Sequence, residues 1–121
     1  AFRAAERRPD KVLGIVAVEP AQGGITDGAA LAGIPVLALY GDHLERDARW
    51  PTIRSRTDSW FGRARALGAR VEVIDLPQRG IRGNSHMLMM ERNNGEIAEL
   101  IDAWLQQQAF PSTKPNWADR D

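Results

Sequence analysis

The sequence predicts an α/β fold with a mostly parallel sheet, and two patterns carry this prediction. Three short apolar runs rich in β-branched residues are bounded by turns, as is typical of strands buried on both faces; they cover residues 12–20, 34–43 and 69–77. Segments with helical periodicity lie around and between them. Alternation of buried strands and helices favours a layered sheet with right-handed crossovers.

The elements follow in order along the chain. A helical run at residues 1–8 is stopped by Pro9, and residues 21–33 form a loop with room for one turn of helix. A helix is expected over 52–68, with Ile53, Trp60, Ala64 and Leu67 on one side and Gly68 just past its end. The last helix, within 96–108, has an apolar face made by Ile97, Leu100, Ile101, Trp104 and Leu105.

The domain organisation predicted is one unit over residues 1–108 and a flexible tail over 109–121. The first residues have no initiator methionine and no capping residue, and three strands make a thin sheet. We therefore expect the chain to be a piece of a larger fold.

Composition excludes several classes of protein. The 16 acidic and 16 basic residues balance, so no overall field favours nucleic acid or an anionic membrane. Cysteine is absent, which excludes a cysteine nucleophile and thiolate metal sites. No apolar run approaches the roughly 20 residues of a membrane span.

Three residues at strand ends could do chemistry together. Glu19 follows the first predicted strand, Asp42 follows the second, and His86 lies in the glycine-rich loop after the third. Functional groups collect at the carboxyl ends of parallel strands, and a carboxylate beside a histidine supports a general base. Asp42 also has a structural explanation, as a cap for the next helix, whereas glutamate is a poor capping residue. Both carboxylates are therefore candidates for the partner of His86, and Glu19 is the one without a ready structural explanation.

The segments "IPVLALYGDH", "ARVEVIDLP" and "GNSHMLMMERNNGEIAELIDAWL" resemble the C-terminal part of an α/β-hydrolase. The similarity is closest to bacterial esterases with a GNSHM-type histidine loop. It implies a serine esterase or lipase-like mechanism, with His86 as the triad base. Most members of the family place the acid after the strand that here precedes Asp42, whereas the esterase group that this sequence resembles places it after the strand that here precedes Glu19. Because Asp42 also has a structural explanation, Glu19 is the preferred acid and Asp42 the alternative.

The resemblance also implies a small-molecule ester substrate and no cofactor, and it places Trp50 beside the mouth of the active site, where it can contact the substrate. Met87, with Met89 and Met90, either lines an acyl pocket, since methionine adapts to irregular apolar shapes, or packs the start of the last helix onto the sheet, which is the preferred interpretation.

The sequence departs from the family at one point: it contains no G-x-S-x-G motif. The N-terminal half with the nucleophile elbow is therefore expected to lie outside these residues, and the 121-residue piece is expected to be inactive without it. The alternative is a non-catalytic α/β-hydrolase-like module that serves binding or assembly.

The sequence disfavours a metal site and a dinucleotide site. Asp42, His43, Glu45 and Asp47 are close in sequence, but their spacing matches no zinc or calcium loop, and no metal is predicted. A dinucleotide site would need G-x-G-x-x-G between a strand and a helix, and the sequence has no such motif.

Overall fold

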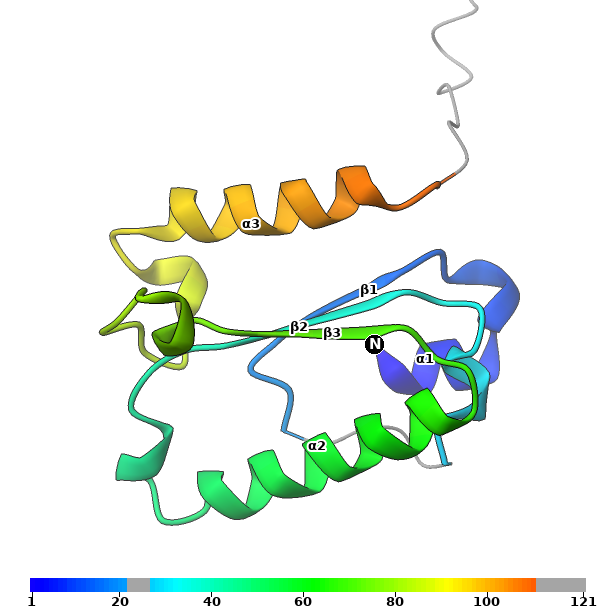
Figure 1. Ribbon diagram of the computed structural model, residues 1–121, viewed down its shortest axis with the longest axis horizontal. Coiled ribbons are helices and arrows are strands. Elements are labelled where there is room, and N and C mark those ends of the chain that lie inside the picture. The colour runs from blue at the N-terminus through cyan, green and yellow to red at the C-terminus, as the bar shows by residue number, and fades with distance from the viewer. Residues whose placement is uncertain (22–26, 111–121) are drawn as a thin grey trace, which may run out of the picture.

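The computed structural model describes residues 1–21 and 27–110. Its helices are α1 (Phe2–Arg7), α2 (Trp50–Ala66) and α3 (Asn94–Gln107), and its strands are β1 (Ile15–Val18), β2 (Val36–Tyr40) and β3 (Val71–Asp75). Within this described part the strands form one parallel sheet in the order β1-β2-β3. α1 and α2 lie on one face of the sheet and α3 covers the other (Figure 1). The predicted α/β fold with a parallel sheet is confirmed.

The central strand β2 joins two apolar layers. All five of its residues are fully buried. Because side chains alternate along a strand, Val36, Ala38 and Tyr40 pack in one cluster with Trp60 and Phe61 of α2. Leu37 and Leu39 pack in the other with Ile97 and Trp104 of α3. This strand therefore needs an unbroken apolar sequence, which is the pattern that predicted it.

Helix α2 begins at Trp50, two residues earlier than expected, with Pro51 in its first turn, where a missing N–H costs no helical hydrogen bond. Gly68 has a φ of +97° and lies just past the end, as predicted. Leu67 was expected on the buried side, but its side chain is 45% exposed. The helix has ended at this residue, with φ −95° and ψ 10°, so the helical spacing no longer places it over the core.

Helix α3 buries Ile97 and Trp104 and partly buries Leu100 and Ile101, as its periodicity predicted. Leu105 is the exception, with 39% of its surface exposed. Adjacent helical residues point about 100° apart, so Trp104 facing the sheet turns Leu105 toward the margin of the interface.

Two of the predicted segments lie only partly within the described residues. The loop at 21–33 contains one 3₁₀ turn at Ala29–Leu31, and residues 22–26 lie outside the described residues. Residues 111–121 of the expected tail also lie outside the described residues. The division into a domain and a tail therefore stays a prediction. None of the helices in the described ranges is long and apolar enough to cross a bilayer.

Candidate active site

The carboxyl ends of the three strands bring the predicted residues to one edge of the sheet. Glu19 directly follows β1, and Asp42 lies two residues past β2. The loop that contains His86 lies between the short 3₁₀ turn after β3 and the next 3₁₀ turn at Leu88–Met90. The parallel register aligns β1 with β2, and β2 with β3, so the segments that follow the strands leave from the same side.

Glu19 is held inside the fold in a strained backbone conformation. Its N–H donates to the carbonyl of Leu39 at 2.8 Å, which continues the sheet pattern one residue past β1. The chain then turns at a φ of +50°, a left-handed value that is unusual for any residue other than glycine. The Glu19 carboxylate accepts a hydrogen bond from the Gly41 N–H at 2.8 Å through Oε1. A Cβ at Gly41 would lie 2.9 Å from this Oε1, so the approach requires glycine.

Glu19 and His86 face each other across the strand ends. Nδ1 of His86 lies 3.8 Å from Oε2 of Glu19, an ion-pair distance rather than a hydrogen bond. The Glu19 side chain is fully buried, whereas 56% of the His86 side chain is exposed. Oε2 is a buried side-chain oxygen without a hydrogen-bond partner in the described part of the chain. A buried oxygen without a donor destabilises the fold, and the His86 ring could supply that donor from its present distance of 3.8 Å.

Trp50, at the start of α2, completes the surroundings of His86. The two rings have centroids 5.1 Å apart and are tilted by 53°. The structure therefore places one predicted substrate-contact residue against the histidine. Met87, the other, follows His86 in the chain and is 46% exposed.

Burial raises the pKa of Glu19 above the usual range of a glutamic acid. The Gly41 N–H, His86 and Arg54 act in the opposite direction, because each favours the ionised carboxylate, but they offset the cost of burial only partly. The site thus contains an acid whose proton affinity is tuned by its neighbours.

The raised pKa gives a prediction for stability against pH. The folded chain holds the Glu19 proton more tightly than the unfolded chain does. The free energy of unfolding should therefore decline as pH rises from about 4.3, the ordinary glutamate value, to the raised value. Urea denaturation of the 121-residue chain at a series of pH values measures this. Glu19→Gln should remove the decline and Glu45→Gln, at an exposed carboxylate, should keep it; an unchanged decline in Glu19→Gln would contradict the prediction.

Asp42 has a different set of partners. Its Oδ1 accepts the N–H of His43 at 2.8 Å, and its Oδ2 accepts the N–H of Gly83 at 3.0 Å. These two bonds, that of Gly83 first, lower the pKa of Asp42. The side chain does not cap the following 3₁₀ turn, as its structural explanation required, because that turn has no side-chain cap. Asp42 instead holds the loop that leads to His86, and the carboxylate facing His86 is that of Glu19.

Beside these residues lies a cleft of about 490 Å³ at the ends of β2 and β3. Asp42, His43 and Glu45 line it, together with Arg54 and Arg82, but neither Glu19 nor His86 does. The cleft thus adjoins the Glu19–His86 pair and does not contain it.

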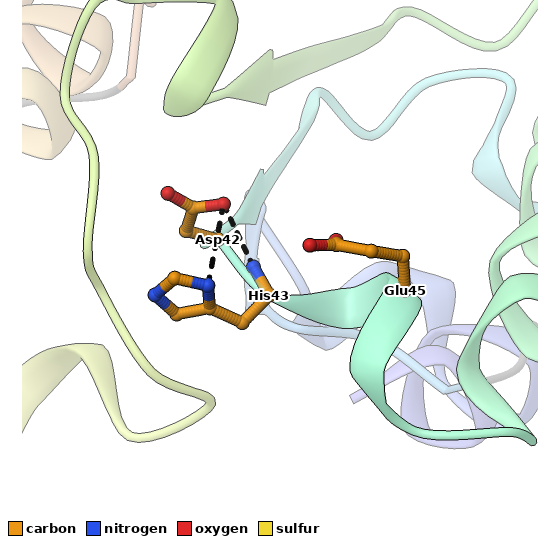
Figure 2. Close-up of side chains that lie close together, drawn as sticks. All are labelled: Asp42, His43 and Glu45. Atoms are coloured by element: carbon orange, nitrogen blue, oxygen red, sulfur yellow. Dashed lines mark hydrogen bonds and ion pairs between the residues drawn. The ribbon is translucent and has the colours of Figure 1, made fainter.

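One group of side chains in this cleft could hold a metal ion. One potential ligand atom from each of Asp42, His43 and Glu45 lies within 4.8 Å of the others (Figure 2). The Asp42 carboxylate already accepts hydrogen bonds from the backbone N–H groups of His43 and Gly83. Nδ1 of His43 lies 3.8 Å from Oδ1 of Asp42. Asp47, which lies close to these three residues in sequence, is not a member of the group.

Sequence reasoning missed the residues that support the site. Gly41 supplies the N–H that holds the Glu19 carboxylate. Asn84 is 1% exposed and exchanges two side-chain hydrogen bonds with Asn93. Their signal in the sequence is weak, since Gly-Asp and Gly-Asn are typical of ordinary turns.

The chain is similar to known proteins that are described as an esterase and a lipase. The chain has a TM-score of 0.83 and 33% sequence identity to a solved structure described as a novel bacterial esterase. The chain resembles an esterase. The match covers 90% of this chain and 35% of the esterase. Over 41 residues, 34% of the chain, it is also 54% identical to the probable secreted lipase phiG of Fungal sp. (strain ATCC 74256) and covers 11% of that protein.

No family profile matches the chain. The resemblance to bacterial esterases inferred from the histidine loop is nonetheless confirmed, and the three-stranded parallel sheet with its helices matches part of the esterase fold. The chain spans about a third of the length of that esterase, 35%, and a smaller share of the lipase, 11%. The similarity supports a relationship to ester hydrolases.

Proposed function

We propose that the chain contributes the base and the acid of a serine carboxylic-ester hydrolase. The observation that carries the proposal is the approach of the exposed His86 ring to the buried Glu19 carboxylate, 3.8 Å apart at the strand-end edge of the sheet. An exposed imidazole with an inward-facing carboxylate has the arrangement that a general base needs. Such contacts are often long before a substrate binds and shorten in the reacting complex.

The proposed reaction is acyl transfer. A serine hydroxyl from outside these residues attacks the ester carbonyl, and His86 takes its proton. His86 then gives this proton to the leaving alcohol, so that an acyl-serine and a free alcohol remain. Water, activated by the same histidine, releases the acid and restores the serine. Glu19 orients the ring and stabilises the imidazolium, and the chemistry needs no cofactor.

Trp50 and Met87 are proposed to contact the substrate. Trp50 lies against the His86 ring, and Met87 is a half-exposed apolar side chain next to His86 in sequence. Together they would offer an apolar surface to a small-molecule ester, since methionine adapts to irregular shapes.

The nucleophile decides between an enzyme and a non-catalytic binding module. Treating the complete gene product with a fluorophosphonate should phosphonylate one serine, identified by peptide mass spectrometry, and heat-denatured protein should not react. The labelled serine should be none of the four in this sequence, Ser55, Ser59, Ser85 and Ser112. Absence of labelling together with absence of p-nitrophenyl ester hydrolysis would favour the binding module. Labelling of one of the four would show that the nucleophile lies within the chain.

A further inference from the structure

The histidine loop, residues 83–87, is hydrogen-bonded both to the turn after β2 and to the segment before α3. On the side of β2, the Gly83 N–H donates to the Asp42 carboxylate at 3.0 Å, and the Asp42 N–H donates to the Asn84 carbonyl at 2.8 Å. On the side of α3, the Ser85 N–H donates to the Glu91 carboxylate at 2.9 Å. The loop is therefore held by specific bonds at the three residues before the histidine.

A pair of side-chain amides makes a further connection between this loop and the start of α3. The Asn84 amide donates to the Asn93 oxygen at 2.7 Å, and the Asn93 amide donates to the Asn84 oxygen at 2.9 Å. Asn84 is almost fully buried. Each side chain satisfies the other only because both present a donor and an acceptor.

Asn93 makes this pair at the expense of a more usual role. It is the N-cap residue of α3, a position where asparagine commonly accepts a backbone N–H of the first turn. Here its side chain makes no capping bond. The amide is directed to Asn84 instead, so the start of α3 is coupled to the histidine loop.

The turn after β2 is hydrogen-bonded both to the Glu19 carboxylate and to the backbone of the histidine loop. The Gly41 N–H donates to the Glu19 carboxylate, and the next N–H, that of Asp42, donates to the Asn84 carbonyl. A Cβ placed on Gly41 would meet Asn84 O and Glu19 Oε1, each at 2.9 Å. The acid and the backbone that leads to His86 are thus packed against one residue, Gly41, and Asn84 precedes His86 by two residues.

We propose that Asn93 is a positioning residue, which acts through Asn84 to fix His86 relative to Glu19. This inference rests on the proposed function, because the distance between His86 and Glu19 affects catalysis only if they are the base and the acid. The pair makes no contact with the reacting atoms, and its contribution is the geometry of the loop. A misplacement of about 1 Å at a catalytic group costs on the order of 100-fold in rate.

The test uses the two histidines of the chain as reporters. In the 121-residue chain labelled with ¹⁵N-histidine, the ring nitrogen shifts report the tautomer of His86, and His43 serves as an internal control. Asn93→Ala should change the His86 ring signals and leave those of His43 in place. The matched control is Asn94→Ala, at a neighbouring exposed asparagine whose amide donates to the Met89 carbonyl at 3.1 Å. In the complete gene product, Asn93→Ala should lower kcat by about 10- to 100-fold with little change in KM.

A double-mutant cycle separates positioning from stability. In a Glu19→Gln background, Asn93→Ala should move the His86 signals much less, because the partner that defines the tautomer is gone. If Asn93→Ala unfolds the chain, Asn93→Asp serves in its place. The aspartate still accepts the hydrogen bond from the Asn84 amide, but it replaces the Asn93 amide donor with an oxygen that faces the Asn84 oxygen. The His86 ring nitrogen shifts should change in the same direction as in Asn93→Ala.

The outcomes are distinct. A lower Tm in Asn93→Ala or Asn93→Asp with unchanged His86 signals would overturn the positioning role. Unchanged His86 signals in Glu19→Gln alone would mean that the two residues are not coupled, and would overturn the proposed function and this inference together. Signals that respond to Glu19→Gln but not to the Asn93 substitutions would remove only the inference.

Discussion

Replacing His86 by alanine should lower kcat for p-nitrophenyl ester hydrolysis by about 10⁴- to 10⁶-fold in the complete gene product. The reason is that His86 would both take the proton of the nucleophile and deliver it to the leaving alcohol. Glu19 cannot take over that task from its place in the fold, because its side chain is fully buried. The Tm should change little, because more than half of the His86 side chain is exposed.

His43→Ala is the matched control for this experiment. His43 is the second histidine of the chain, and it lies beside Asp42 at the same edge of the sheet. Its replacement should leave kcat within about tenfold of the unmodified protein, because its imidazole has no contact with Glu19 in the described structure. A larger loss in His43→Ala than in His86→Ala would assign the base to His43 and contradict its assignment to His86.

Glu19→Gln should lower kcat by about 10⁴-fold, and Asp42→Asn by less than about tenfold. Gln keeps the size of the side chain and can still accept the Gly41 N–H through its oxygen. It loses the negative charge that stabilises the imidazolium and presents an amide to Nδ1, which favours the wrong tautomer. Both variants are measured by steady-state kinetics in the complete gene product.

Asp42→Asn controls for the loss of a carboxylate at the same edge. The asparagine oxygen can keep the bond from either His43 or Gly83, so the histidine loop should stay near its place. The opposite ranking of the two variants would assign the triad acid to Asp42. Equal and small effects would contradict an acid role for both.

The sheet and its helices were predictable because their pattern is local. Val36–Tyr40 is apolar without interruption, and that is what a strand between two helical layers requires. The errors lie at margins: Leu67 falls after the last helical residue, and Leu105 falls beside the interface. Helical spacing says which residues share a face, but it does not say how wide the buried face is.

The candidate site was predictable only as a set of residues, not as contacts. Order along the strands placed Glu19, Asp42 and His86 at one edge, and the choice of Glu19 over Asp42 rested on the lack of a capping role. The loop that contains His86 is held by bonds between residues far apart in sequence, such as Asp42 with Gly83 at 3.0 Å. No periodic pattern records such pairings, and the amide pair of Asn84 and Asn93 was missed for the same reason.

The left-handed backbone at Glu19 has a consequence for protein engineering. Glycine or asparagine would adopt its φ of +50° with less strain, but neither carries a carboxylate. Aspartate tolerates the conformation better than glutamate, yet it is one methylene shorter in a site where the carboxylate must reach Gly41. A selection for thermal stability alone would therefore tend to replace the residue proposed to support catalysis. Screens of this protein need to select for turnover and stability together.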